Sequence, residues 1–271
     1  MRIFSAGHHD RSSTMCKKGI RLKSVLTFAL LWAISNSVYS QDKKYQYYNQ
    51  VWLAYFNQTR FGQRWGWWTD LHLRTKEDFF TNFSQSILRF GLTYYLNDDT
   101  KITVGYAYVS TYPAEGHKEV TQPEHRPWQQ VQWHTRYSRI RTAQYLRLEE
   151  RFRRKILNDS TLAGGYNFNY RIRYNFSFQA PLSKKGFQPH SFAFIVNDEL
   201  HVNFGKQIVY NYFDQNRFFI GMGYQPSKTG QLQFGYLNVF QQLTPGNQYR
   251  VINAARIFYY HSLDLRKKKA Q

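Results

Sequence analysis

The chain has 271 residues, with 37 Lys and Arg against 17 Asp and Glu, a formal net charge of +20 and 19% aromatic residues. No uninterrupted apolar stretch of about twenty residues occurs, which excludes a helical membrane span. The single cysteine, Cys16, lies in a region that we expect to be removed, so the mature chain has no disulfide framework, Cys-based zinc site or Cys nucleophile.

Residues 1–40 have the pattern of a cleaved signal peptide. An apolar core at 25–34 (VLTFALLWAI) is right for export and short for a membrane anchor. The cations that precede it are Lys17, Lys18, Arg21 and Lys23. We expect cleavage after Ser40 and a mature domain at 41–271, and Met15 is an alternative start. Cleavage leaves 31 basic and 16 acidic side chains, a charge of +15.

From residue 46 onward, alternating apolar and polar residues predict β-strands separated by polar breaks. The expected strands are 47–57, 64–75, 83–96, 101–112, 128–137, 140–152, 164–180, 190–204, 217–224, 231–241 and 249–265. A tight hairpin is expected at Asn97-Asp98-Asp99, turns at 226–230 and 244–247, and a longer polar loop at 113–126. Since no helical pattern intervenes, short connections predict antiparallel neighbours.

The clearest strand is 164–180, GGYNFNYRIRYNFSFQA. Aromatic residues or Ile occupy every second position from Tyr166 to Phe178, and polar residues or Arg lie between them. Because successive side chains in a strand point to opposite faces, one face is aromatic and the other is polar and cationic. A strand of a soluble β-sandwich is one interpretation. A transmembrane barrel strand, with its aromatic face toward lipid, is the one that we favour.

Strand length and aromatic placement also favour a membrane barrel. Strands of about ten residues span a bilayer when they are tilted. Tyr and Trp gather near strand ends, where aromatic girdles lie in such barrels: Trp65, Trp67, Trp68, Tyr94, Tyr95, Tyr112, Trp128, Tyr259 and Tyr260. The count of about eleven segments conflicts with the even number of strands in bacterial single-chain barrels. We therefore expect ten or twelve strands, with 46–57 not spanning or one strand missed.

Charged residues gather on the faces that would line the lumen. In 140–155 one face carries Arg141, Tyr145, Arg147, Glu149, Arg151 and Arg153, and a second polar row is Asn197, Glu199, His201 and Asn203. Arg171 and Arg173 lie across a hairpin from the first row. The predicted lumen cluster is Arg141, Arg147, Glu149, Arg151, Arg171, Arg173, Glu199 and His201. A salt-bridged plug is the main interpretation, because unpaired buried charges are costly. An anion-selective pore or a site for acidic glycans is the alternative.

Motifs of catalysis and ligand binding are missing from the sequence. No histidine of the mature chain has Ser two positions on, the spacing of a barrel lipase or deacylase. Histidines and glutamates in the 113–126 loop match no metal motif. Most arginines occupy alternating strand positions, which argues against nucleic-acid binding. We expect no catalytic residue, cofactor or metal site.

Several segments resemble a known family. They are 147–152 (RLEERF), 198–200 (DEL) with 203–205 (NFG), 213–224 (FDQNRFFIGMGY) and 232–236 (LQFGY). The chain resembles domain of unknown function 2490, exported proteins of Bacteroidetes-type Gram-negative bacteria, over about 45–265 and most strongly over 146–238. The resemblance implies an outer-membrane β-barrel without an established activity. The chain departs from many such barrels by ending in Arg-Lys-Lys-Lys-Ala-Gln instead of an aromatic residue.

The sequence thus predicts an all-β fold, a single antiparallel up-and-down transmembrane β-barrel of 10 or 12 strands in the cell outer membrane. The expected partners are outer-membrane lipid, the barrel-assembly machinery and an anionic solute or glycan. The expected function is a narrow channel or a structural barrel with an Arg-rich lumen. Two alternatives stay open: a lipid- or glycan-modifying barrel enzyme, and a secreted soluble β-protein that binds acidic polymers.

Overall fold

The computed structural model describes residues 42–76, 82–114 and 117–266, and residues Lys43–Gln271 form one compact unit. The expected signal peptide with Met15 and Cys16, the loop residue Glu115 and the C-terminal residues 267–271 lie outside the described residues. The described residues form eleven strands: β1 (Lys44–Arg60), β2 (Trp65–Thr75), β3 (Phe83–Tyr95), β4 (Thr100–Thr111), β5 (Gln122–Arg136), β6 (Arg141–Asn158), β7 (Thr161–Pro181), β8 (Ser191–Phe204), β9 (Phe213–Gln225), β10 (Gly230–Gln242) and β11 (Gln248–Asp264).

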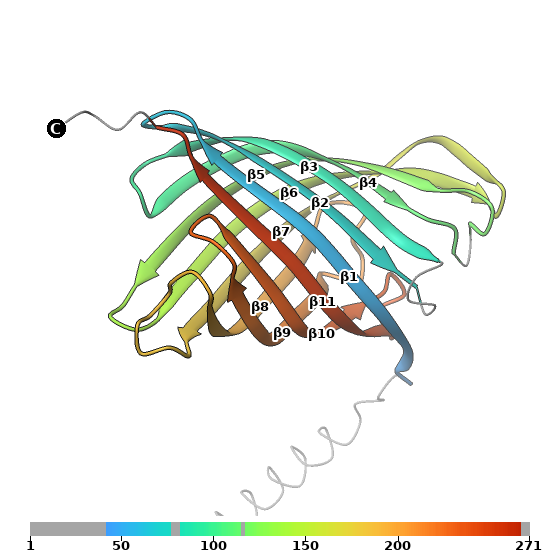
Figure 1. Cartoon of the computed structure of the whole chain (residues 1–271). Coiled ribbons are helices and arrows are strands. Elements are labelled where there is room, and N and C mark those ends of the chain that lie inside the picture. The colour runs from blue at the N-terminus through green and yellow to red at the C-terminus, as the bar shows by residue number, and fades with distance from the viewer. Residues whose placement is uncertain (1–41, 77–81, 115–116, 267–271) are drawn as a thin grey trace, which may run out of the picture. The chain divides into compact units, whose positions relative to one another are not determined.

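The strands close into a barrel in which every strand pairs with its neighbours in the sequence, and β1 pairs with β11 (Figure 1). Consecutive strands are antiparallel, whereas the closing pair is parallel, with Lys44 opposite Gln248 and Arg60 opposite Asp264. The expected number of ten or twelve strands is therefore wrong, and so is the expectation of purely antiparallel pairing. The even number assumed that β1 and β11 run in opposite directions. A parallel seam removes that requirement, and β1 is a full strand of 17 residues.

Parallel closure places the two ends of the strand series at opposite ends of the barrel. We call them the Lys44 end, where β1 begins, and the Asp264 end, where β11 finishes. The expected hairpin at 97–99 lies at the Asp264 end, where the side chain of Asn97 accepts hydrogen bonds from the amides of Asp99 and Thr100. Arg60, the last residue of β1, donates to Asp98 of this turn at 2.6 Å and lowers the pKa of that carboxyl.

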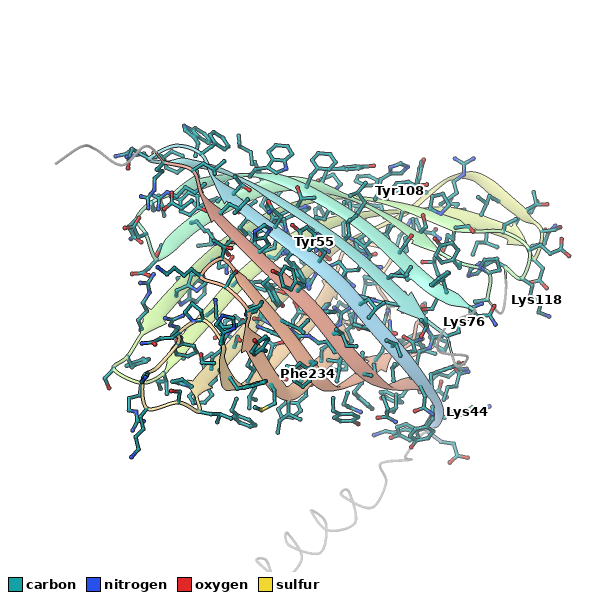
Figure 2. All side chains as sticks on the ribbon, viewed as in Figure 1. Lys44, Tyr55, Lys76, Tyr108, Lys118 and Phe234 are labelled. Atoms are coloured by element: carbon teal, nitrogen blue, oxygen red, sulfur yellow. The ribbon has the colours of Figure 1, made fainter. Side chains whose placement is uncertain are left out.

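Alternation decides which face of each strand points outward. In β7, Asn169, Arg171 and Arg173 are buried inside the barrel, whereas Ile172 and Tyr174 are exposed on its outer surface. Exposed apolar side chains cover the outside of the other strands as well, including Tyr55, Tyr108 and Phe234, which Figure 2 labels. The expected division into an outer aromatic face and an inner polar face is confirmed.

Part of the interior is filled by aromatic side chains rather than charges. Trp128 and Phe219 are fully buried, and each packs against a pair of glycines from neighbouring strands. A Cβ atom on Gly105 would lie 2.8 Å from the Trp128 ring, and one on Gly221 would lie 2.7 Å from the Phe219 ring. Glycine thus makes room for two large rings inside a narrow barrel. The expectation that Trp68, Trp128 and Tyr260 belong to outer aromatic girdles is wrong, because all three point inward.

Candidate functional site

A cavity of about 720 Å³ lies inside the barrel. Residues that line it come from both ends, with Lys76 and Gln122 near the Lys44 end and Arg141 and Lys228 near the Asp264 end. Two glutamates, Glu124 and Glu199, belong to the lining. Twelve arginines line the same cavity: Arg74, Arg89, Arg126, Arg141, Arg147, Arg151, Arg153, Arg171, Arg173, Arg217, Arg250 and Arg256. The surface of the lumen is therefore strongly cationic.

One side of the lumen is held by ion pairs, and we call it the salt-bridged sector. Its carboxylates are Glu124 on β5, Glu149 on β6, Glu199 on β8 and Asp214 on β9, all buried. Glu124, Glu149 and Glu199 touch arginines from their own or a neighbouring strand, because the register brings inward-facing positions together. Asp214 on β9 instead reaches Arg171 on β7, two strands away. Hydrogen-bonded pairing of this kind offsets the cost of removing the charges from water.

Glu149 is the centre of this sector. It accepts from Arg171 at 2.5 and 2.9 Å through Oε2 and from Arg173 at 2.8 Å through Oε1. Arg171 also donates to Asp214 at 2.8 Å, and Arg173 also donates to Glu199. Four strands, β6 to β9, are thereby joined by alternating charges across the lumen.

Two further groups complete the sector. Glu124 accepts from Arg151 at 2.7 and 3.1 Å and from Arg126 at 3.0 Å. Glu199 also accepts from Tyr145 and, at 3.3 Å, from Arg217. The Nε2 atom of His201 lies 2.9 Å from Glu199.

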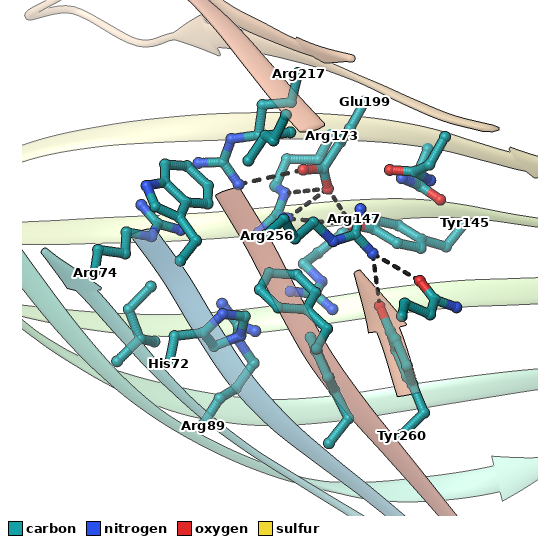
Figure 3. A pocket seen from close by; sticks show the side chains of 18 of the residues that line it. His72, Arg74, Arg89, Tyr145, Arg147, Arg173, Glu199, Arg217, Arg256 and Tyr260 are labelled. Carbon is teal, nitrogen blue, oxygen red and sulfur yellow. Dashed lines mark hydrogen bonds and ion pairs between the residues drawn. The ribbon is translucent and has the colours of Figure 1, made fainter. Parts of the chain in front are cut away.

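A second group of charges surrounds Trp52, and we call Arg74, Arg217 and Arg256 the seam arginines because Trp52 lies on β1 at the parallel seam. The guanidinium carbon of Arg74 lies 3.7 Å from the centre of the Trp52 ring, and that of Arg217 lies 5.2 Å from it. Arg256 packs against Phe219 and Phe258 at 3.9 and 4.3 Å. Figure 3 shows the three arginines on different strands, with Arg256 turned toward Tyr260 and away from Arg74.

Two seam arginines have neutral partners. Arg74 donates to Gln85 at 2.8 Å, and Arg256 donates to Gln233 at 2.9 Å and to Tyr260 at 3.2 Å. Among the described residues, neither guanidinium forms an ion pair, and no carboxylate oxygen lies within 4.0 Å of either. The Nε atoms of both are buried without a hydrogen-bond acceptor within the described part of the chain. Among the described residues no carboxylate compensates their positive charge, which therefore makes the electrostatic potential in the cavity more positive.

The structure brings seven of the eight residues of the predicted cluster into the salt-bridged sector or its border. Arg147 borders it, donating to Gln130 at 2.8 Å with Glu149 3.9 Å away. Arg141 does not join, because it lies exposed at the Asp264 end against the ring of Phe187 at 3.9 Å.

Sequence reasoning missed Glu124, Asp214 and the seam arginines. The expected loop at 113–126 was too long, because β5 begins at Gln122 and turns Glu124 into the lumen. Asp214 lies where the register of β8 and β9 shifts, so simple alternation does not place it. Arg256 follows Arg74 by 182 positions in the sequence, so no local pattern relates the two. The parallel seam makes both of them cross-strand partners of Trp52.

Two histidines of the lumen lie beside carboxylates. His72 lies 3.0 Å from Asp70, and His201 lies 2.9 Å from Glu199, so two histidines face carboxylates in the lumen. In the described residues neither of them hydrogen-bonds to a Ser or Thr hydroxyl, the nucleophile that such a pair would activate. Nor does any group of three or more metal-ligating side chains gather in the described ranges.

A family model described as a protein of unknown function (DUF2490) matches residues 49–250. The chain belongs to this family, whose function is not known, and its own described residues form a β-barrel. No curated protein and no solved structure matches the chain. Within the residues that the structure describes, no helix is long and apolar enough to cross a membrane.

Proposed function

We propose that this protein is an outer-membrane β-barrel whose lumen conducts small anions. The observation that carries the proposal is the cavity lined by residues of both barrel ends, with twelve arginines and two glutamates in its wall. A cavity wall of one charge sign raises the local concentration of ions of the opposite sign. Rings of arginine select anions in the same way in known pores.

The outer surface supports a membrane location. Every described strand has at least 11 residues, enough for a tilted strand to cross a bilayer, which takes about 9–11. Exposed apolar side chains follow the outward positions of neighbouring strands, such as Leu88, Phe90 and Leu92 on β3. A continuous apolar surface of this kind is costly in water and favourable in lipid. Export through the expected signal peptide at 1–40 is part of the proposal.

The salt-bridged sector has a structural role in this proposal. Its arginines are paired with Glu124, Glu149, Glu199 and Asp214, so they narrow the lumen while most of their charge is compensated. The anion-attracting charge comes from arginines such as Arg74 and Arg256, which have neutral partners among the described residues. Conduction and stability therefore depend on different arginines.

Planar-bilayer recordings test the channel. Purified protein refolded in detergent is added to a bilayer that separates two KCl concentrations, and the reversal potential gives the selectivity. We expect a chloride-selective current, and we expect Arg74→Gln with Arg256→Gln to lower that selectivity. Arg154→Gln is the matched control, because Arg154 stacks on Tyr166 and does not line the cavity. A sealed bilayer with folded protein, or a cation-selective current, contradicts the proposal.

Cell fractionation tests the location separately. The proposal expects the mature protein, beginning at Gln41, in the outer-membrane fraction with heat-modifiable gel mobility. Recovery of the folded protein from the periplasm or the medium instead supports the alternative of a soluble barrel that binds acidic polymers. Altered lipid A or phospholipid profiles in a deletion strain would support the enzyme alternative.

A further inference from the structure

We propose that the lumen holds a binding site for a hydroxylated organic anion, such as a sugar acid, on the Asp264 side of the ion pairs. The site consists of His134, Ala143, Asn175, Ser177 and Asn197, and we call it the polar pocket. The inference deepens the proposed function, on which it rests for the access of the solute through the lumen. It names the class of solute that stops in the lumen, whereas chloride passes.

Small side chains make room for the polar pocket. One cross-strand row of the lumen wall runs from His134 on β5 through Ala143 on β6 and Ser177 on β7 to Asn197 on β8. All four side chains line the cavity. In the next row toward the Lys44 end, the large side chain of Tyr145 takes the place on β6 that Ala143 has here. The row of Ala143 and Ser177 is therefore the hollow part of this wall.

Two polar side chains of the pocket lack hydrogen-bond partners. Asn175 is only 8% exposed and lines the cavity. It lies between Tyr145 and Glu199 in its cross-strand row, but these two bond to each other. Among the residues that the structure describes, no group donates to or accepts from the side chain of Asn175 or of Ser177. A buried amide without a partner is costly, and the donors and acceptors of a bound solute offset that cost.

The charge of the surrounding lumen favours an anion. In the described lining, Glu199 is the last carboxylate on the way to the Asp264 end, since Glu124 lies near the Lys44 end. Arg141 and Lys228 line the cavity beyond the pocket. A positive lumen raises the local concentration of anions. Because the pocket itself contains no arginine or lysine, the lumen as a whole attracts the charge of the solute, and the pocket binds its hydroxyl groups.

The hydrogen-bonding groups of the pocket match hydroxyl groups rather than a bare ion. The amide of Asn175 and the hydroxyl of Ser177 each donate and accept, as the hydroxyl groups of a solute do. Asn197 donates to the carbonyl of Phe176 at 3.1 Å, and its own side-chain oxygen remains as an acceptor. Asn175 and Ser177 are two positions apart on β7, about 7 Å along the strand. A six-carbon sugar acid reaches both of them, whereas chloride touches one at a time.

Calorimetric titration of the refolded protein with two matched anions is the direct test. Glucuronate carries ring hydroxyls, and cyclohexanecarboxylate has the same charge and a six-membered ring without them. We expect glucuronate to bind at least about tenfold more tightly, because each hydrogen bond contributes a few-fold in net affinity. A pocket that holds only water would bind the two anions alike, and that result overturns the proposal.

Variants of the pocket assign the difference to particular side chains. Asn175→Ala with Ser177→Ala should lower the glucuronate affinity to that of cyclohexanecarboxylate, while heat-modifiable mobility stays that of the folded barrel. Gln144→Leu is the matched control, because Gln144 follows Ala143 on β6 but accepts from Tyr174 at 2.6 Å and does not line the cavity. It should leave the glucuronate affinity unchanged. A glucuronate affinity of the folded double variant within about twofold of the wild type rejects the pocket.

Chloride current with added glucuronate distinguishes this proposal from the channel proposal. Both hold if glucuronate reduces the chloride current of the wild type and not of the double variant. Tighter binding of glucuronate without any current rejects the channel and keeps the pocket. A chloride current together with equal calorimetric affinities for the two anions keeps the channel and rejects the pocket.

Discussion

Glu149 illustrates how a single carboxylate stabilises a charged interior. Its side chain is fully buried, and besides Arg171 and Arg173 it has Arg126 and Arg147 within 3.7 and 3.9 Å. Four cations around one anion leave local positive charge, so the fold depends on that anion more than on any one of its partners. Removing one member of a buried charged group leaves the others without compensation.

Glu149→Gln should therefore destabilise the barrel strongly. The substitution keeps the size of the side chain but removes the charge that Arg171 and Arg173 share. We expect a loss of about 3–5 kcal/mol in the free energy of unfolding, the range for breaking a buried ion pair. Urea unfolding of the refolded protein, followed by tryptophan fluorescence, measures it.

Glu150→Gln is the control for this substitution. Glu150 is the next residue on β6 but points to the outer surface, where it accepts a hydrogen bond from Gln129 at 3.4 Å. Because it faces no arginine cluster, we expect no destabilisation, and in lipid the loss of this outward-facing charge should stabilise the barrel slightly. Equal unfolding midpoints for the two variants would show that the Glu149 ion pairs contribute nothing particular to the fold.

At the residue scale, the sequence predicts which face of a strand a side chain takes, but not which residues of the next strand lie opposite it. Alternation places Arg147, Glu149 and Arg151 on one face from the sequence alone, and their inward direction is observed. It cannot say that Glu149 meets both Arg171 and Arg173, since that depends on how β6 and β7 are aligned. A shift of one residue in register would turn these side chains to the other face.

The seam between β1 and β11 is the element that departs most from the expected fold. The alternating pattern of the sequence predicts the β1 segment as a strand. The rule that antiparallel barrels have an even number of strands then argues against counting this segment as a spanning strand. The sequence of neither strand indicates the direction of its partner, because β1 and β11 are separated along the chain by all the other strands. Strand existence was therefore predictable, whereas the direction of closure was not.

Engineered disulfides test the direction of closure. Cys16, the one cysteine of the chain, lies in the expected signal peptide, so the mature domain offers a cysteine-free background. Asn49 and Asn253 are cross-strand partners in the parallel seam. Asn49→Cys with Asn253→Cys should form a disulfide on mild oxidation, because partnered strand positions meet the Cα separation of about 4.4–6.8 Å that a disulfide needs.

The matched control uses Asn49→Cys with His261→Cys. In the parallel register His261 is the partner of Asn57, eight positions along β1 from Asn49 and about 26 Å away at about 3.3 Å per residue. An antiparallel closure centred on Leu53 and Ile257 would instead bring Asn49 and His261 together. Cross-linking of the control pair and not of the first pair would refute the parallel seam.

At the scale of the whole molecule, the apolar outer surface is interrupted by carboxylates, Glu150 on β6 and Asp198 on β8. Asp198 is exposed on the outer face of β8, with Phe176 and Phe218 as its cross-strand neighbours. Both neighbours are exposed, and the carboxylate accepts a hydrogen bond from Asn216 at 2.9 Å. In water this arrangement costs little, whereas in a bilayer it places a charge near the middle of the apolar belt.

Two substitutions on this face therefore separate a membrane barrel from a soluble one by the sign of their effects. Asp198→Leu should stabilise a barrel in lipid vesicles by about 1–2 kcal/mol, and Leu200→Arg, two positions on along the same face, should destabilise it by about 2–4 kcal/mol. Urea unfolding in vesicles measures both variants. A soluble barrel would tolerate Leu200→Arg, since Leu200 is already 39% exposed and an exposed arginine side chain is well hydrated. Because the two residues share one face, opposite signs of these effects require lipid there, whatever flows through the lumen.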